Sequence, residues 1–316
     1  MMKSMLIALF ASAAAIVAAP GPVHAQEAAQ ADTAAPAPAK KTGYAEVDGV
    51  NYYYEIRGEG EPLLLLHGGL GSIDMFGPVL LPKLAEGRQV IGVDLQGHGR
   101  TALGDRPISL EAMGDDMAEI VAKLGYGKVD VLGYSFGGGV ALRLAVQHPE
   151  AVRRVALVSA GYAQNGFYPE MIAMQAQMSP AMADMMKDTP MYKSYVAVAP
   201  KPEDFPRLLG QMGDYMRKPY DYSADVAALK MPVMLVFGDA DMYRPEHVVK
   251  FYQLLGGGLK DAGWMRETMS QNRLAIIPNR THYDMFFAPE LATTVLPFLN
   301  GETEVKSWND QVEAAK

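Results

Sequence analysis

Short apolar runs that alternate with helical patterns place the strongest constraint on the fold of this chain. The runs of strand length are Leu63–His67, Gln89–Asp94, Lys128–Gly133, Val155–Ser159, Val233–Phe237 and Leu274–Ile277. Because they are continuously apolar, they are typical of parallel strands covered on both faces. Between two of them, apolar residues recur at helical spacing from Leu110 to Leu124, just before Gly125. The alternation predicts an α/β fold with a doubly wound, mostly parallel sheet, whose ligands bind outside the carboxyl ends of the strands.

The N-terminus predicts a secretory leader. Lys3 supplies a positive charge, an apolar stretch runs from Met5 to Ala19 with only Ser12 interrupting it, and Val23-His24-Ala25 ends in a small residue. These features are typical of a signal peptide over residues 1–25 that is cleaved after Ala25. The alternative is an uncleaved membrane anchor, although the stretch is shorter than the roughly 20 residues that a spanning helix needs. We therefore expect a periplasmic or secreted protein with no stable membrane insertion after cleavage.

The remaining chain divides by composition. Residues 26–42 are rich in Ala and Pro and predict a flexible linker. Residues 43–302 carry the α/β pattern, and they start with a hairpin signal at Asp48-Gly49. Residues 303–316 form a C-terminal tail.

Composition excludes several classes of chemistry. The chain has no cysteine, which rules out disulfides, thiolate metal ligands and cysteine nucleophiles. Its formal net charge is −8, and no run of clustered Lys and Arg is present, which argues against binding to nucleic acid.

Residues 162–222 interrupt the alternation. They contain no good strand but nine methionines, and Met171, Met174, Met178, Met182 and Met185 follow one another at spacings of three and four. One interpretation is a helical hairpin that buries its methionines. The other is a Met-rich helical cap, inserted after the sixth strand of the domain, whose flexible thioethers line an apolar pocket. Since a cap can do both, we expect Met171, Met174 and Met178 to contact substrate.

A serine lies where one predicted strand meets a helix. Gly133-Tyr134-Ser135-Phe136-Gly137 is a G-x-S-x-G motif that follows an apolar strand and opens a helical pattern. In that context the glycines permit a cramped turn that exposes the serine Oγ. A serine hydroxyl becomes a nucleophile only with a base that a third group orients. The alternative is an ordinary tight turn with an idle serine.

The base and the acid are expected at the ends of later strands. Among the histidines, only His282 both follows Ser135 in the chain and lies after a late strand, whereas His247 is predicted on an exposed helix face. Asp241 and Asp239 both follow the preceding strand. Asp241 is favoured as the acid because the chain has left the strand at that point, and Asp239 is expected to cap the turn.

The loop after the first long apolar run offers donors for an oxyanion. Gly69, with Leu70 as the alternative, and Phe136 after the nucleophile are the predicted backbone N–H donors. Leu70 and Tyr134 are also expected to contact substrate. The loop lacks the lysine of a P-loop and the spacing of a dinucleotide-binding motif, which argues against a nucleotide site.

Taken in order, these motifs resemble the α/β-hydrolase superfamily. The matching residues are His67-Gly68-Gly69, Asp94-Leu95-Gln96-Gly97-His98-Gly99-Arg100, Gly133-Tyr134-Ser135-Phe136-Gly137, Gly238-Asp239-Ala240-Asp241 and Thr281-His282. The resemblance covers about Tyr44 to Leu299. It implies structural roles for Asp94 and His98. It also implies a capped serine hydrolase with the triad Ser135, Asp241 and His282, because superfamily dehalogenases and epoxide hydrolases carry aspartate at the nucleophile position.

The expected activity is hydrolysis of small-to-medium apolar carboxylic esters, without metal or cofactor. The alternatives are a lactone or C–C bond hydrolase, a perhydrolase-type enzyme with the same triad, or a binding protein that has lost the chemistry. Proline iminopeptidases usually show a proline in the loop where this chain has Leu70. A glycine-rich insertion with Trp264 is expected either at the pocket rim, where Trp264 would contact substrate, or as a surface excursion.

Overall fold

The computed structural model describes residues 40–302 and 306–316. The predicted signal peptide, most of the predicted linker and the first residues of the predicted tail lie outside these ranges. Within them, eight strands form one sheet in the order β1-β2-β4-β3-β5-β6-β7-β8. The first two pairings in this order, β1 with β2 and β2 with β4, are antiparallel, and the other five are parallel. The strands are β1 (Lys41–Val47), β2 (Val50–Arg57), β3 (Glu61–Leu66), β4 (Arg88–Val93), β5 (Val129–Tyr134), β6 (Val152–Val158), β7 (Val233–Ala240) and β8 (Arg273–Thr281).

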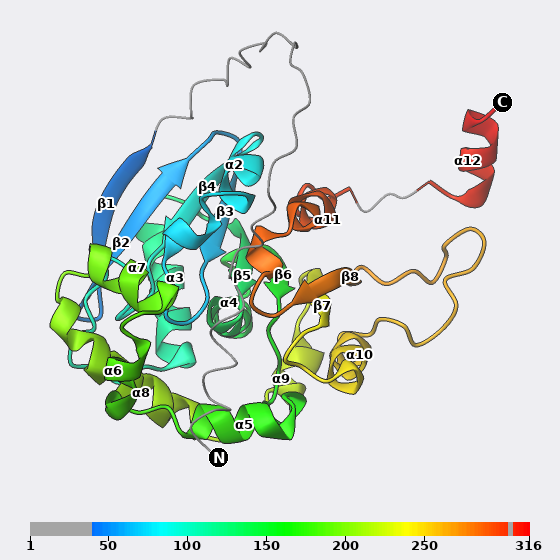
Figure 1. Cartoon of the computed structure of the whole chain (residues 1–316). Helices are drawn as coiled ribbons and strands as arrows, with labels where there is room; N and C mark the ends of the chain where they lie inside the picture. The colour runs from blue at the N-terminus through cyan, green and yellow to red at the C-terminus, as the bar shows by residue number, and fades with distance from the viewer. Residues whose placement is uncertain (1–39, 303–305) are drawn as a thin grey trace, which may run out of the picture. The chain divides into compact units, whose positions relative to one another are not determined.

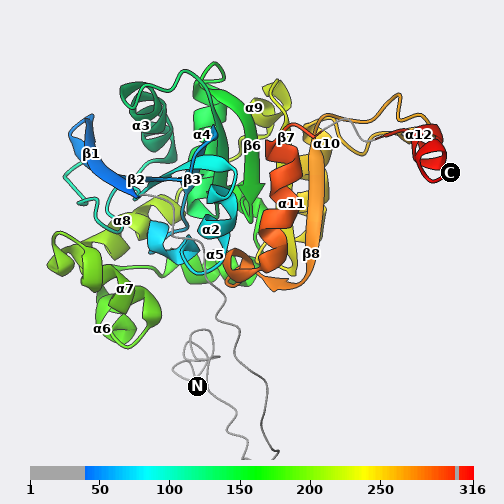
Figure 2. The ribbon, with the colours of Figure 1, turned by 90° about the horizontal axis from the view of Figure 1, so that it is seen from above.

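Helices cover both faces of the sheet and form a cap between β6 and β7, which confirms the predicted fold class (Figures 1 and 2). The α-helices are α2 (Leu80–Ala85), α3 (Leu110–Lys123), α4 (Phe136–Gln147), α5 (Pro169–Ala176), α6 (Ala183–Met186), α7 (Pro190–Val198), α8 (Phe205–Met216), α9 (Ser223–Ala228), α10 (Pro245–Leu254), α11 (Pro289–Leu299) and α12 (Trp308–Ala314). Short 3-10 helices are η1 (Ile73–Phe76), η2 (Gln164–Gly166), η3 (Pro180–Met182), η4 (Pro202–Asp204) and η5 (Met285–Phe287).

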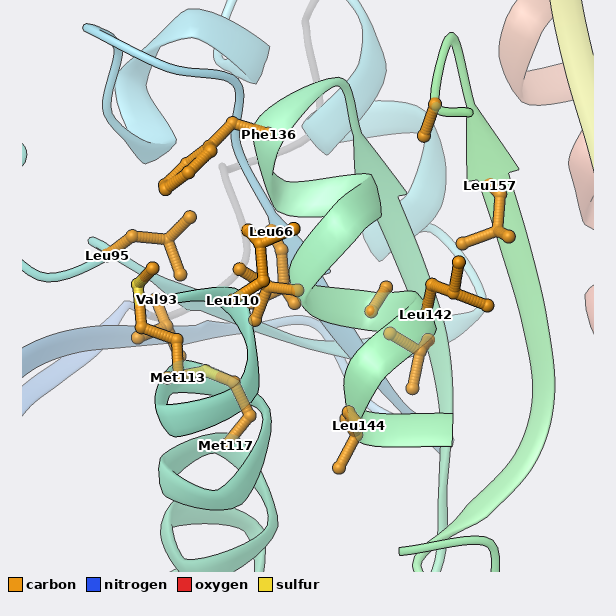
Figure 3. Packing of buried hydrophobic residues seen from close by; sticks show 14 of the residues in the cluster. Leu66, Val93, Leu95, Leu110, Met113, Met117, Phe136, Leu142, Leu144 and Leu157 are labelled. Atoms are coloured by element: carbon orange, nitrogen blue, oxygen red, sulfur yellow. The ribbon is translucent and has the colours of Figure 1, made fainter. Parts of the chain in front are cut away.

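The continuous apolar strands feed two cores. In β3, Leu64 and Leu66 belong to the core under α3 and α4, whereas Leu63 and Leu65 belong to the core under α2 and α11. Successive side chains of a strand point to opposite faces, so a strand buried on both faces needs apolar residues at every position. Figure 3 shows the first of these cores, in which side chains of α3 and α4 pack with those of the strands.

Two antiparallel segments join the cap to the sheet. The N–H of Tyr222 donates to the carbonyl of Tyr162 at 2.8 Å, and the N–H of Gln164 donates to that of Tyr220 at 3.0 Å. Figure 1 shows α5, α6, α7 and α8 gathered in one layer of the molecule, drawn in green. The segments therefore hold the two ends of the cap together.

Two expectations need correction. Strand β8 runs to Thr281, beyond the predicted Ile277, because an edge strand tolerates the polar residues that end it. His247 is buried, with 5% of its surface exposed, because its ring stacks on Tyr162 at 4.1 Å where the chain enters the cap. No helix in the described ranges combines the length and the apolar character that crossing a bilayer requires.

Candidate active site

Ser135 occupies a strained turn between β5 and α4. Its φ of 53° and ψ of −116° lie in a region that residues with a side chain rarely adopt. A Cβ at Gly137 would overlap the carbonyl oxygens of Leu66 and His67, and one at Gly133 would approach Ala141 Cβ to 2.8 Å. The N–H of Ser135 donates to the carbonyl of Val158 at 2.9 Å. The two glycines of the motif are therefore required by the close packing of this turn.

The structure brings Ser135, His282 and Asp241 into one hydrogen-bonded chain. Ser135 Oγ lies 2.8 Å from His282 Nε2, and His282 Nδ1 lies 3.0 Å from Asp241 Oδ1. Asp239 is exposed and instead accepts the backbone N–H of Arg280 at 3.2 Å. The geometry thus favours Asp241 over Asp239 as the partner of the histidine. It also leaves Nε2 facing the serine hydroxyl.

The Asp241 carboxylate is held in its ionised form. Burial by itself raises the pKa of Asp241. Hydrogen bonds from His282 and Ser159, together with the charge interaction with His282, lower this pKa by more than burial raises it, so the net shift is downward. The N–H of Met242 also donates to Oδ1 at 2.7 Å. An ionised carboxylate beside Nδ1 favours the tautomer that carries its proton on Nδ1, so that Nε2 can accept from Ser135.

Ser159 is a component that the sequence analysis missed. Its hydroxyl donates to Asp241 Oδ2 at 2.6 Å, and its N–H donates to the carbonyl of Val236 at 2.8 Å. The side chain is buried and the backbone has a φ of 50°. The only signal in the sequence was its place at the carboxyl end of a strand next to the one that bears the nucleophile.

The predicted oxyanion loop is rigidly supported. His67 Nδ1–H donates to the carbonyl of Gly68 at 2.8 Å, while its Nε2 accepts the N–H of Leu95 at 3.0 Å. Burial lowers the pKa of His67 to about 4, which keeps it neutral in this role. Leu70 is buried and has a φ of 57°, in a turn closed by the Gly71 N–H and the Gly68 carbonyl at 3.2 Å.

The two expected oxyanion donors lie next to each other. A Cβ built on Gly69 would be 3.6 Å from Phe136 Cβ. Phe136 is the first residue of α4, and the first N–H groups of a helix have no acceptor within it. The N–H of Phe136 is therefore available to a ligand oxygen near Ser135, and the backbone of Gly69 lies beside it.

Asp94 and His98 support neighbouring loops, in keeping with their expected structural roles. Asp94 accepts the N–H groups of Ile73 and Arg100, each at 2.8 Å. His98 Nδ1–H donates to the carbonyl of Gln96 at 2.8 Å, and burial lowers the pKa of His98 to about 3. These bonds tie the loop after β4 to the loop after β3.

Helix α8 of the cap lies over both predicted donors. A Cβ at Gly69 would be 3.2 Å from Met212 Cε, and the ring of Tyr215 meets that of Phe136 edge-on at 5.5 Å. Met212 and Tyr215 are three residues apart and so share a helix face. Neither residue was predicted from the sequence. Their signal was the helical period that Leu208, Leu209 and Met212 continue.

The three predicted methionine contacts lie in α5 and just after it. Helix α5 buries no residue fully; Met171 and Met178 are partly buried against the core under α3 and α4, and Met174 is partly exposed. The structure places Met212, rather than these three, against the oxyanion loop.

Tyr134 is placed differently from the expectation, and Trp264 lies in a surface excursion, which was the alternative to the pocket rim. The Tyr134 side chain is buried beneath the histidine loop, and its hydroxyl donates to the backbone carbonyl of His282. It therefore supports the base. Trp264 is 77% exposed and meets Trp308 edge-on at 5.6 Å.

The loop that carries Trp264 lies at the amino-terminal ends of the strands, whereas Asp241 and His282 follow their carboxyl ends. Helix α10 carries the chain away from the carboxyl end of β7, and the excursion ends where Asn272 accepts the N–H of Val233, the first residue of β7. Closeness in sequence to Asp241 and His282 was misleading because a whole helix intervenes. Figure 1 shows this loop projecting from α10 and β8.

In the part of the chain that the structure describes, no three His, Cys, Asp or Glu side chains are grouped so that they could hold a metal ion. The groups gathered around Ser135 are a hydroxyl beside an imidazole, a carboxylate behind the imidazole, and the adjacent backbone of Gly69 and Phe136. Such an arrangement is chemically suited to acyl transfer.

Comparisons with known proteins indicate the family that the chain resembles. Residues 61–202 match the family model described as alpha/beta hydrolase fold. The chain is 38% identical to the dihydrolipoyllysine-residue acetyltransferase component of an acetoin cleaving system from Cupriavidus necator, over 40% of this chain and 35% of that protein. It is 36% identical to a 2-hydroxymuconate semialdehyde hydrolase from Pseudomonas sp., over 33% of this chain and 38% of that protein. These matches span little more than a third of the relatives' length.

A solved structure extends the likeness to most of the chain. A thermophilic esterase from Thermogutta terrifontis has the same fold with a TM-score of 0.64 and 20% identity, over 83% of this chain and 98% of that one. The family match over residues 61–202 and the shared fold of the described chain support the α/β-hydrolase superfamily. The resemblance expected from the motifs is thus confirmed at the level of the superfamily.

Proposed function

We propose that the protein is a serine hydrolase that cleaves carboxylic esters through an acyl-enzyme. Ser135 Oγ attacks the ester carbonyl while His282 Nε2 takes the hydroxyl proton. Asp241 keeps the imidazole oriented and stabilises the imidazolium that forms. The N–H groups of Phe136 and Gly69 bind the developing oxyanion.

The two half-reactions use the same base. When the tetrahedral intermediate collapses, His282 returns its proton to the leaving alcohol. A water molecule then loses a proton to His282 and attacks the acyl carbon, and the second collapse restores the Ser135 hydroxyl and releases the carboxylic acid. The observation that carries this proposal is the hydrogen-bonded chain from Ser135 through His282 to Asp241.

Small-to-medium apolar groups are the proposed substrates. Phe136 follows Ser135 in the chain, and Met212 lies against Gly69 beside it, so both offer apolar contacts near the hydroxyl. In the described ranges, no arginine or lysine hydrogen-bonds Ser135, Asp241 or His282. Such a wall favours uncharged acyl groups over anionic ones.

The proposal is tested with p-nitrophenyl esters of increasing acyl length, comparing wild type with Ser135→Ala. Loss of the nucleophile from such a triad costs on the order of 10⁶ in kcat, so the activity should vanish in the variant. A rate optimum at short or medium acyl chains would support the substrate class. Activity that survives Ser135→Ala would refute the mechanism. If neither protein hydrolyses these esters, lactones and compounds with a cleavable C–C bond are the substrates to assay next.

We also propose that residues 1–25 direct export to the periplasm or outside the cell. The support is the charge and apolar pattern of that stretch. The mass of the protein purified from an exporting host should correspond to a chain that begins at Gln26. An intact Met1 in the exported fraction would contradict the cleavage.

A further inference from the structure

Tyr134 contacts three of the segments that carry the proposed catalytic groups. It immediately precedes Ser135 in the chain, and its hydroxyl donates to the backbone carbonyl of His282. A Cβ built on Gly68, in the predicted oxyanion loop, would lie 2.7 Å from Tyr134 Cε1. The turn of the nucleophile, the loop of the base and the predicted oxyanion loop therefore all pack on this one side chain.

The Tyr134 ring is held firmly by the core under α2 and α11. Its side chain is 4% exposed, and the rings of Phe76 and Phe286 meet it edge-on at 6.5 Å and 5.4 Å. A phenol oxygen lies on the long axis of its ring, so an oxygen on a ring held in this way has a fixed place. The carbonyl of His282 is thus bonded to a donor whose position the core determines.

A second set of hydrogen bonds closes the turn that carries the base. Asp284 Oδ1 accepts both the backbone N–H and the side-chain hydroxyl of Thr281, each at 2.7 Å. The Thr281 hydroxyl oxygen in turn accepts the N–H of Tyr283 at 3.2 Å. Because His282 lies between the bonded residues, one carboxylate oxygen fixes the backbone on both sides of the base.

The hydroxyl of Tyr134 completes a cycle of contacts that includes the proton-transfer pair. Ser135 Oγ lies 2.8 Å from His282 Nε2, the carbonyl of His282 accepts from Tyr134, and Tyr134 is bonded through the chain to Ser135. Loss of the Tyr134 hydroxyl would open this cycle and leave the backbone of the base free to shift relative to the nucleophile. Catalytic groups need such supporting bonds, because proton transfer depends on a narrow range of distances.

We propose that Tyr134 and Asp284 are positioning residues that hold His282 at hydrogen-bonding distance from Ser135. Each acts through other groups: Tyr134 through the His282 carbonyl, and Asp284 through the turn that Thr281 closes. This inference rests on the proposed mechanism and adds to it the two side chains that set the place of the base.

The test removes each bond with a small change to the side chain. Tyr134→Phe deletes only the phenol oxygen, and Asp284→Ala deletes the acceptor of the two Thr281 bonds. A displaced base slows the chemical step without weakening substrate binding. We therefore expect kcat on the best p-nitrophenyl ester to fall about tenfold or more in both variants, with KM within about twofold of wild type.

Two further variants separate positioning from folding. Asp284→Asn keeps an oxygen that can accept both Thr281 bonds, so its kcat should stay within about threefold of wild type. Tyr126→Phe also deletes a phenol oxygen, one that donates to Gln89 Oε1 at 2.6 Å near the start of β4, and should lower Tm without changing kcat. An unchanged kcat in Tyr134→Phe or in Asp284→Ala, or equal losses in the two Asp284 variants, would overturn the proposal. If Tyr134→Phe does not fold, the two Asp284 variants decide.

A second measurement distinguishes failure of this inference from failure of the proposed ester hydrolysis. A fluorophosphonate probe reacts with an activated serine: an Oγ–P bond forms, the P–F bond breaks, fluoride leaves and the base takes the hydroxyl proton. The second-order rate constant for labelling Ser135, with Ser135→Ala as the unreactive control, reports on the Ser135–His282 pair whatever the substrate is.

The outcomes of the labelling are separate for the two proposals. If wild type is labelled but hydrolyses none of the esters, ester hydrolysis alone fails, and labelling about tenfold slower in Tyr134→Phe and Asp284→Ala still supports the positioning. Equal labelling rates in wild type and in both variants, or a wild-type Ser135 that is not labelled, would refute it.

Discussion

Ser159 and Asp241 meet across the ends of adjacent strands, where the serine hydroxyl donates to Oδ2 of the carboxylate at 2.6 Å. The opposite oxygen, Oδ1, faces His282 at 3.0 Å. The acid is therefore held from both sides, once by the base that it orients and once by a residue of β6's end. In this position Ser159 has a left-handed backbone with a φ of 50°, a conformation that is strained for a residue with a side chain.

Removing the Ser159 hydroxyl should change the acid limb of the pH profile. The bond lowers the pKa of Asp241, so its loss raises that pKa, and activity that needs the carboxylate should fail at a higher pH than in wild type. The same sign applies to stability. A carboxyl whose pKa is lowered on folding stabilises the fold above its ordinary value of 3.8, and this stabilisation is lost as the pH falls through the lowered value.

Two variants separate the hydroxyl from the backbone. Ser159→Ala and Ser159→Gly both lose the bond and should share the shift in kcat against pH, with kcat lowered about tenfold by the loss of one hydrogen bond to a charged group. Only Ser159→Gly relieves the left-handed backbone, so it should have the higher Tm. An acid limb identical to that of wild type in both variants would remove Ser159 from the positioning of Asp241.

Asp241→Asn and Asp239→Asn should differ by orders of magnitude. The first replaces the partner of His282 Nδ1 and favours the wrong tautomer, for which kcat should fall by about 10⁴. The second alters only an exposed acceptor of the Arg280 N–H, and kcat/KM should stay within about threefold. Initial rates on the best p-nitrophenyl ester decide between them. Comparable losses in the two variants would contradict the assignment of the acid.

Gly137→Ala should destabilise the fold, whereas Gly127→Ala should not. A Cβ at Gly137 would overlap backbone carbonyl oxygens of β3 and its following residue, which cannot move aside as a flexible side chain could. We expect a loss of about 3 kcal/mol in the free energy of unfolding, from urea titrations. A Cβ at Gly127 meets no atom within 4 Å, so this variant should be within about 1 kcal/mol of wild type.

Three buried histidines should make stability fall in mild acid. Burial lowers the pKa of His67 and His247 to about 4 and that of His98 to about 3, from 6.5. Below pH 6.5 the unfolded chain therefore binds protons that the folded chain does not bind. The free energy of unfolding is highest above pH 6.5 and declines as the pH falls toward the pKa values of the folded state. A shift of this size corresponds to on the order of 3 kcal/mol for one histidine.

Urea midpoints measured between pH 7 and pH 4 test this decline. His247→Gln, which removes one of the three buried imidazoles, should make the slope shallower. A midpoint that does not change with pH over this range would show that these imidazoles are not kept neutral by the fold.

Much of the site was predictable because its parts are local. The strand, the turn glycines and the following helix that expose Ser135 are contiguous in sequence, and Asp241 and His282 each follow a recognisable apolar strand. The paired cores on the two faces of the sheet also follow from continuous apolar runs. These predictions depend only on backbone periodicity and on the direction of parallel strands.

The parts that escaped prediction depend on contacts between distant segments. Ser159 is one small polar residue at a strand end, and nothing near it in sequence announces a bond to Asp241, 82 residues later. His247 lies on a helix face that looks solvent-exposed until the cap segment covers it. Met212 reaches the oxyanion loop only because α8, rather than the methionine-rich α5, is the cap helix that lies against the core.

The excursion between α10 and β8 has a practical consequence. It begins and ends near the amino-terminal ends of the strands, whereas Ser135, Asp241 and His282 all follow the carboxyl ends of strands. A tag or surface tether inserted near Leu259, which is exposed, would immobilise the protein by its rear edge and leave the cap facing the solution. Coupling through this loop would thus preserve substrate access where attachment through the cap would block it.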